Sequence, residues 1–141
     1  GCSAINETPR NLTDQQLRAL AERDGVFGLM LHPIAIDPER NTIERAIDHL
    51  EHAADVIGPD RVCLGGDWTK RLNALMPGPA PPDGLMPPGL AVGSTIEGLS
   101  GPEDYPALEQ ALRGRGWDDD RIEGVLSRNL FRFVRQALPE S

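Results

Sequence analysis

Two short apolar runs divide the chain, one at residues 26–31 and the other at residues 62–64. Neither run alternates with polar residues, and neither is long enough for a buried helix. Both runs therefore predict strands, and the first is typical of a strand covered on both faces. The first run ends at His32-Pro33, and the second, after a Gly58-Pro59 breaker, continues as a strand over 62–66 to Asp67.

The segments before each run have the apolar spacing of helices. Thr13 is expected to cap the first helix, with Gln16 completing a capping box, and the helix is expected to end at Asp24-Gly25. Asn41 is expected to cap the second helix. The apolar stripe of the first helix contains Leu17, Leu20 and Ala21, and that of the second contains Ile43, Ile47, Leu50, Ala54 and Ile57. The order helix, strand, helix, strand predicts a parallel βα arrangement.

Residues 71–104 follow neither period and are rich in Pro, Gly and Met. They predict a long loop, and so long a loop in a compact fold is usually a lid or a pocket wall. Helices are expected again over 105–141: one begins at Tyr105-Pro106, one begins at Asp118, and an amphipathic one ends the chain. The last of these carries the apolar residues Leu130, Phe131, Val134 and Leu138.

A parallel sheet of two strands is not stable alone. We therefore interpret residues 1–141 as a single segment from the last part of a larger α/β fold. The chain also begins Gly-Cys without an initiator Met, which agrees with this interpretation. A small, mostly helical domain with a two-stranded core is the alternative, because helices can cover a short sheet.

Composition restricts the partners. The net charge is −8, the isoelectric point is about 4.8, and no run of basic residues occurs. Nucleic acids and anionic membranes are poor partners for such a chain. No apolar run approaches the roughly 18 residues of a membrane span, and no targeting segment is visible, which favours a cytoplasmic location. With only Cys2 and Cys63, a disulfide framework is not expected.

Asp67 and His32 stand where the two predicted strands end, and in α/β sheets and barrels this edge carries the chemistry. An aspartate there can also be a turn former, and a histidine there can simply bond to backbone. Arg10, held in a loop by Pro9, can bind a carboxylate with two hydrogen bonds. Its alternative role is a surface ion pair with Asp14.

His49 and His52 lie three residues apart on the second predicted helix, a spacing that can place two metal ligands side by side. No third ligand lies near them in the sequence, which favours a structural role for both. The sequence contains neither a glycine-rich phosphate loop nor a nucleophilic serine elbow.

Six short motifs occur in a fixed order along the chain. They are Thr8-Pro9-Arg10-Asn11-Leu12-Thr13-Asp14, Asp48-His49-Leu50-Glu51-His52, Gly65-Gly66-Asp67-Trp68, Gly98-Leu99-Ser100-Gly101-Pro102-Glu103-Asp104-Tyr105-Pro106-Ala107-Leu108, Gly116-Trp117 and Asn129-Leu130-Phe131-Arg132. This series resembles the membrane (renal) dipeptidase family of zinc metallopeptidases over nearly the whole chain. The resemblance implies a (βα)8 TIM-type barrel that cleaves dipeptides with two zinc ions, and of which this segment holds the last two strands and the C-terminal helices.

The resemblance also implies roles for single residues. Arg10 matches the arginine that binds the terminal carboxylate of the substrate, and Asp67 matches a catalytic aspartate that handles protons. His32 stands where the family often has a tyrosine that lines the substrate pocket. The zinc ligands are expected upstream of Gly1, so none is expected in this chain. Thr69-Lys70 replace an acid and a glycine of the family pattern, and residues 71–97 diverge from its usual loop.

The leading interpretation is thus the C-terminal part of a zinc-dependent metallodipeptidase, inactive until the upstream part of the barrel or a partner chain completes it. The complete enzyme can also form a homodimer. The alternative is a non-catalytic α/β fragment or subunit that binds a partner chain through its unpaired strands.

Overall fold

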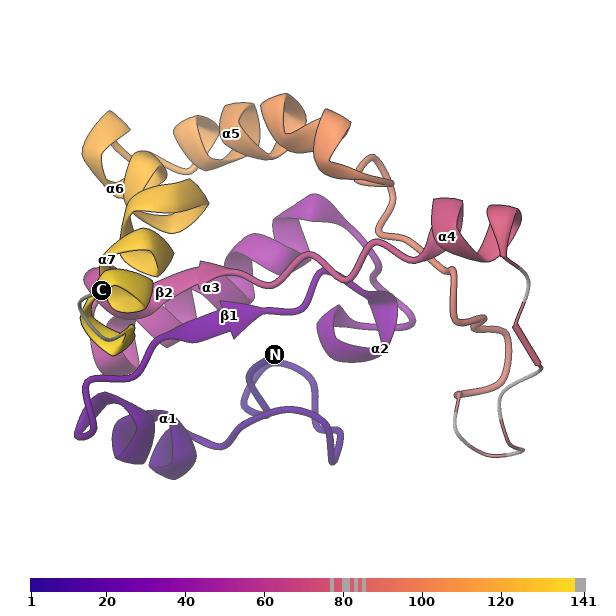
Figure 1. Ribbon diagram of the computed structural model, residues 1–141, viewed down its shortest axis with the longest axis horizontal. Coiled ribbons are helices and arrows are strands. Elements are labelled where there is room, and N and C mark those ends of the chain that lie inside the picture. The colour runs from indigo at the N-terminus through magenta and orange to yellow at the C-terminus, as the bar shows by residue number, and fades with distance from the viewer. Residues whose placement is uncertain (77, 80–81, 83, 85, 139–141) are drawn as a thin grey trace.

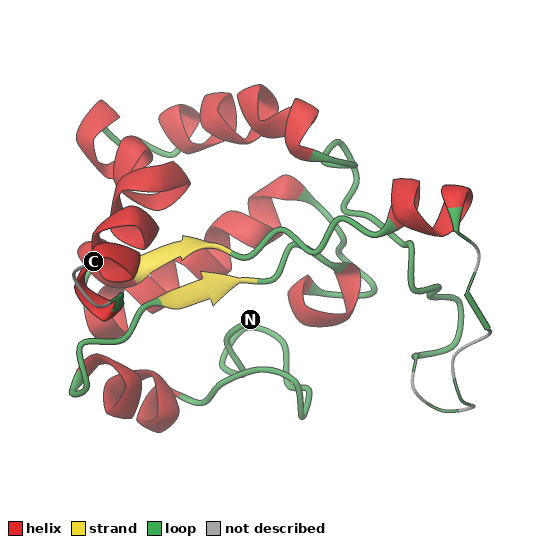
Figure 2. Cartoon of the chain, viewed as in Figure 1, coloured by secondary structure: helices red, strands yellow, loops and turns green. Residues whose placement is uncertain are grey.

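The computed structural model describes residues 1–76, 78–79, 82, 84 and 86–138 (Figures 1 and 2). Parts of the predicted 71–104 loop, and the end of the predicted 105–141 helical region, lie outside the described residues. The helices are α1 (Asp14–Ala21), α2 (Pro33–Ile36), α3 (Ile43–Ile57), α4 (Lys70–Leu75), α5 (Tyr105–Gly114), α6 (Asp119–Glu123) and α7 (Asn129–Ala137). The strands are β1 (Phe27–Leu29) and β2 (Val62–Leu64), and single turns of tighter or wider helix are η1 (Pro59–Arg61), η2 (Pro102–Asp104) and η3 (Gly124–Arg128).

The two strands form a parallel pair joined through α3, as the sequence predicts. Phe27 pairs with Val62 and Leu29 with Leu64. Beyond the strands, Gly65 N donates to Leu29 O at 2.8 Å, and Leu31 N donates to Gly66 O at 3.3 Å. The pairing therefore continues to the carboxyl ends of both predicted strands.

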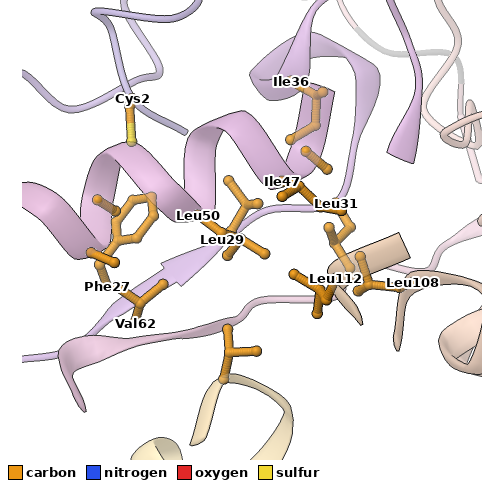
Figure 3. Close-up of a cluster of buried hydrophobic side chains, with 14 of the residues drawn as sticks. Cys2, Phe27, Leu29, Leu31, Ile36, Ile47, Leu50, Val62, Leu108 and Leu112 are labelled. Atoms are coloured by element: carbon orange, nitrogen blue, oxygen red, sulfur yellow. The ribbon is translucent and has the colours of Figure 1, made fainter. Parts of the chain in front are cut away.

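The core lies between this strand pair, α3 and α5. Figure 3 shows Phe27, Leu29 and Leu31 from the β1 segment beside Ile47 and Leu50 of α3. The predicted stripe of α3 is confirmed: of its members Ile47, Leu50, Ala54 and Ile57 are buried, and Ile43 packs against the cluster. From α5 the core receives Leu108 and Leu112.

One prediction about β1 is wrong. Gly28 is exposed, so β1 is not covered on both faces along its length. The reason is the alternation of a strand: Phe27 and Leu29 share one face, and Gly28 belongs to the other. Only the face of Phe27 and Leu29 packs into the core.

Capping confirms one predicted helix start and corrects another. The Thr13 side chain accepts a hydrogen bond from Gln16 N and the Gln16 side chain accepts one from Thr13 N, which is the predicted capping box. In α1 only Leu17 is buried, whereas the other two predicted stripe residues are half-buried. The cap of α3 is Thr42 and not Asn41, because Thr42 Oγ1 accepts from Arg45 N at 3.2 Å. Asn41 Nδ2 instead donates to Thr95 O at 2.8 Å.

Two helices, α2 and α4, lie where the sequence predicts no helix. The residues after His32 form the single turn of α2, and the predicted 71–104 loop contains most of α4 and all of η2. Both helices are short, four and six residues, and so short a segment does not display an apolar period.

The C-terminal helices lie where the sequence predicts them, but the apolar residues of the last helix are not buried. Asp118 Oδ1 accepts from Arg121 N at 2.8 Å and caps α6, and η3 leads without a break into α7. The apolar residues of the α7 region remain exposed; they are Leu130, Phe131, Val134 and Leu138. No helix in the described part of the chain has the length and apolar character needed to cross a bilayer. Cys2 and Cys63 are buried free thiols.

Candidate active site

His32 and Asp67 directly follow the last paired residues of the two strand segments. The last hydrogen bond between the two strand segments joins Leu31 N to Gly66 O, and His32 and Asp67 are the next residues on each segment. Two short segments that run parallel thus bring these residues to the same edge, the carboxyl edge, as the sequence predicts.

A hollow of about 160 Å³ lies at this edge. Its lining contains all three predicted site residues, Arg10, His32 and Asp67, although they come from three different segments of the chain. The remaining lining residues are Met30, Ile34, Thr69, Met86 and Val92. Met86 and Val92 belong to the predicted 71–104 loop, which therefore contributes to the wall of a pocket.

Asp67 has an unusual backbone. Its φ is 70° and that of Gly66 is 52°, so both residues lie in the left-handed region. Aspartate tolerates this region better than most residues, yet such a conformation costs on the order of 1 kcal/mol or more and often marks a functional site. The Asp67 side chain is exposed and forms no ion pair with any residue in the described ranges.

Arg10 stands on a turn that its neighbour anchors. Asn11 N donates to Thr8 O at 3.0 Å, and the Asn11 side chain is buried. The predicted alternative for Arg10, a pair with Asp14, is wrong. Asp14 instead accepts from His52 Nε2 at 2.7 Å and lies 3.9 Å from Arg18. Among the described residues Arg10 has no ionic partner, so its guanidinium can receive a ligand carboxylate at the hollow.

His32 is buried, with 4% of its surface exposed, and caps α2 with its own ring. Its Nδ1 accepts a hydrogen bond from Ile34 N at 3.2 Å. The neutral ring therefore carries its proton on Nε2. A histidine in this tautomer can donate a hydrogen bond from Nε2 to an oxygen atom in the hollow.

The other two histidines have structural roles, as the sequence favours. His49 is completely buried and bonds to backbone through both ring nitrogens, whereas His52 bonds to Asp14. In the ranges that the structure describes, no three His, Cys, Asp or Glu side chains gather in a way that could hold a metal ion. The described residues therefore do not fit a zinc site by themselves.

Sequence reasoning missed two asparagines that shape the site. Asn11 Nδ2 donates to Ala35 O at 2.8 Å, and Asn6 Nδ2 donates to Ile34 O and Ala35 O, both at 3.3 Å. Asn11 is adjacent to Arg10 in a motif, which is the signal that could have drawn attention to it.

Two other motifs come into contact in the fold. The ring centroids of Trp68 and Tyr105 lie 6.2 Å apart.

Comparison with known proteins agrees with the resemblance. The family model "Membrane dipeptidase (Peptidase family M19)" matches residues 1–76. The chain belongs to the membrane dipeptidase family. It is 30% identical to the dipeptidase verJ of Clonostachys rogersoniana over 94% of this chain and 29% of that protein. It is 28% identical to dipeptidase 3 of Mus musculus over 90% of this chain and 22% of that protein. The chain thus spans less than a third of these relatives.

Solved structures support the fold of this dipeptidase-family chain. The dipeptidase AC has a TM-score of 0.72 at 23% identity, over 96% of this chain and 35% of its own. A metallopeptidase from Rhodobacter sphaeroides, solved with a phosphinate mimic of the dipeptide L-Ala-D-Ala, has a TM-score of 0.72 at 24% identity, over 97% of this chain and 34% of its own. The mixed helix and sheet arrangement is therefore that of about one third of these proteins.

Proposed function

We propose that this chain is the C-terminal part of a zinc-dependent dipeptidase and that upstream residues complete its (βα)8 barrel. The observation that carries the proposal is the shared hollow of Arg10, His32 and Asp67 at the carboxyl edge of β1 and β2. Active sites of βα barrels lie at this edge. Membership of the family, and the small share of each relative that the chain spans, support the same conclusion.

In this proposal the zinc ligands lie in the upstream part of the enzyme, since the described residues of this chain do not form a metal-binding cluster. The chain contributes the groups that hold the substrate and move its protons. Arg10 binds the terminal carboxylate of a dipeptide, and His32 Nε2 donates a hydrogen bond to the same end of the substrate. Asp67 accepts a proton from the attacking water and passes it to the leaving amine.

Replacement of Asp67 by Asn in the complete enzyme tests this role. Asparagine has nearly the same shape and also tolerates a left-handed backbone, but it cannot accept the proton. We expect kcat for dipeptide hydrolysis to fall by about 10²–10⁴-fold while the metal content stays the same. Asp24→Asn is the matched control, because Asp24 also has a positive φ of 56° but lies outside the hollow. Full activity of Asp67→Asn would remove Asp67 from the mechanism.

A second candidate function is a non-catalytic subunit that binds a partner chain. The exposed apolar residues of the α7 region favour a contact surface. Metal analysis and size-exclusion chromatography of the 141-residue chain test the proposed division of the enzyme. We expect no stoichiometric zinc, no hydrolysis of dipeptides and self-association through exposed edges. A compact, zinc-loaded and active monomer would contradict the proposed division of the enzyme.

A further inference from the structure

The one-turn helix α2 connects the candidate site to the rest of the chain, but it makes few hydrogen bonds of its own. Within it, Ala35 N and Ile36 N donate to His32 O at 2.9 and 3.1 Å. All four of its residues are buried. The carbonyl groups at the end of a helix have no partner inside the helix, and buried carbonyls need donors.

Three side chains from other parts of the chain supply these donors. Asn6 Nδ2 lies 3.3 Å from both Ile34 O and Ala35 O, and Asn11 Nδ2 lies 2.8 Å from Ala35 O. His49 Nε2 lies 2.8 Å from Ile36 O. We call Asn6, Asn11 and His49 the α2 clamp. Each of the last three carbonyl groups of α2 is paired by the clamp.

The ring of His49 has one tautomer that satisfies both of its contacts. Its Nδ1 accepts from Cys2 N at 2.9 Å, so the proton lies on Nε2 and is donated to Ile36 O. The ring is completely buried, and burial lowers the pKa of His49 to about 4. The neutral donor form is therefore present at neutral pH.

The clamp joins the two residues that we assign to the substrate carboxylate. Asn11 directly follows Arg10 in the chain, and α2 directly follows His32. The bond from Asn11 to Ala35 O thus links the backbone of the Arg10 turn to the backbone of the His32 turn. His49 belongs to α3, and its bond to Ile36 O connects α2, and with it the His32 turn, to that helix. Figure 1 shows α2 and α3.

We propose that Asn6, Asn11 and His49 are positioning residues, which hold the Arg10 turn and the His32 turn in the relative placement that binds a substrate carboxylate. This inference rests on the proposed function. None of the three residues lines the hollow, so they act through the backbone of α2. A displacement of about 1 Å in a binding group can cost on the order of a hundredfold in rate.

Asn11→Ala in the complete enzyme tests the clamp without changing the charge around Arg10. We expect KM for a dipeptide to rise by about tenfold or more and kcat to change much less, because the carboxylate-binding groups shift while Asp67 does not. Asn41→Ala is the matched control. Asn41 also donates its amide to a backbone carbonyl, but to Thr95 O and not to α2, so KM should stay within about twofold.

His49 provides a second test that separates the donor from the packing. His49→Leu removes the donor to Ile36 O, whereas His49→Gln keeps an amide N–H that can replace it. We expect His49→Leu to raise KM as Asn11→Ala does and His49→Gln to restore part of the loss. His52→Leu, on the same helix, changes a histidine that bonds to Asp14 and should leave KM unchanged.

Two readouts distinguish positioning from general loss of structure. A dipeptide amide, which lacks the carboxylate, should show less than about a threefold change in KM for the clamp variants. Hydrogen exchange of residues 32–36, followed by mass spectrometry, should be faster in Asn11→Ala and His49→Leu than in the two controls.

Equal losses for the dipeptide and its amide would overturn the proposal, and so would unchanged exchange of residues 32–36. If the unmodified complete enzyme hydrolyses no dipeptide, the proposed function fails. Hydrogen exchange then decides alone whether the clamp orders α2, and unchanged exchange again overturns the clamp.

Discussion

Both ends of the β1–β2 pair contain an aspartate with a left-handed backbone, but the two aspartates have different surroundings. At the amino end, Asp24 has a φ of 56°, closes the turn after α1 and lies 3.0 Å from the Arg61 guanidinium. At the carboxyl end, Asp67 has a φ of 70°, forms no ion pair within the described ranges and lines a hollow. The turn accounts for the conformation of Asp24, whereas no local bond accounts for that of Asp67.

Two buried asparagines extend this comparison. Asn129 at the amino end donates to Pro59 O and Val62 O, at 2.9 and 2.8 Å, and so attaches the start of α7 to the start of β2. Asn11 at the carboxyl end donates to Asn6 O and Ala35 O and lies next to Arg10. Asparagine amides thus donate to backbone carbonyls at both ends of the strand pair. At the amino end these bonds attach α7 to β2, whereas at the carboxyl end they hold the turn that carries the exposed Arg10. The difference supports the proposed placement of the site at the carboxyl end.

The largest expected effect concerns the pH dependence of stability, which should arise at the carboxyl end. The pKa of His49 falls from 6.5 to about 4 in the folded chain because the ring is buried. Below pH 6.5 the unfolded chain therefore binds a proton that the folded chain does not. Stability due to His49 is complete above pH 6.5, decreases as the pH falls toward 4, and decreases by on the order of 3 kcal/mol in total.

Chemical denaturation of the complete enzyme between pH 4 and pH 7 measures this change. The nearby groups Cys2, Arg45 and Asp48 are present in the comparison variant His49→Gln, which lacks only the imidazole. The variant should have a flatter pH profile over this range. Parallel profiles would show that His49 does not contribute to the acid sensitivity of the fold.

Asn129→Ala should have the next largest effect, and on stability alone. The substitution leaves two backbone carbonyls of the amino end without their donor, and the residue is 2% exposed. We expect a loss of about 2 kcal/mol in the free energy of unfolding and unchanged kcat and KM for the folded enzyme. Thermal unfolding and steady-state kinetics measure both, with Asn73→Ala in α4 as the control. A change in KM would contradict the separation of the two ends.

Arg10→Lys should affect binding and not stability. Lysine keeps the charge but loses the planar pair of donors, so KM for a dipeptide should rise by about tenfold, or roughly 1–2 kcal/mol, with little change in kcat. A dipeptide amide should be nearly indifferent to the substitution. Kinetics with both substrates measure the difference, and equal effects would assign Arg10 to a structural role.

The smallest expected effect on stability comes from substituting the two left-handed aspartates. Glycine adopts a positive φ more easily than aspartate, so Asp24→Gly and Asp67→Gly should each relieve strain and change the unfolding free energy by less than about 1 kcal/mol. The exposed ion pair of Asp24 with Arg61 offsets little of this change. Only Asp67→Gly should abolish dipeptide hydrolysis. Loss of activity in both variants would contradict the assignment of the chemistry to the Asp67 end alone.

Several elements of the fold could be predicted from sequence because their determinants are local. The capping box joins Thr13 to Gln16, three positions later, and the stripe of α3 repeats every three or four residues. The parallel order and the placement of His32 and Asp67 at one edge follow from the order of helices and strands. The cap of α3 was predicted one residue too early, because Asn41 and Thr42 are both good caps and the choice depends on Thr95, which Asn41 contacts.

By itself, the sequence determined the described helices other than α2 and α4, the two strands and the three candidate site residues, since each depends on neighbours within a few positions or on a motif. Only the tertiary structure decided that Arg10 joins His32 and Asp67 at one hollow, that α2 is a helix, and that the α7 region keeps its apolar residues exposed. The α2 clamp shows the physical reason. Its bonds join residues 24 and 13 positions apart, and the Cys2 contact of His49 spans 47. A partner that lies so far along the chain leaves no periodic or capping signal in the sequence around the residue that it bonds.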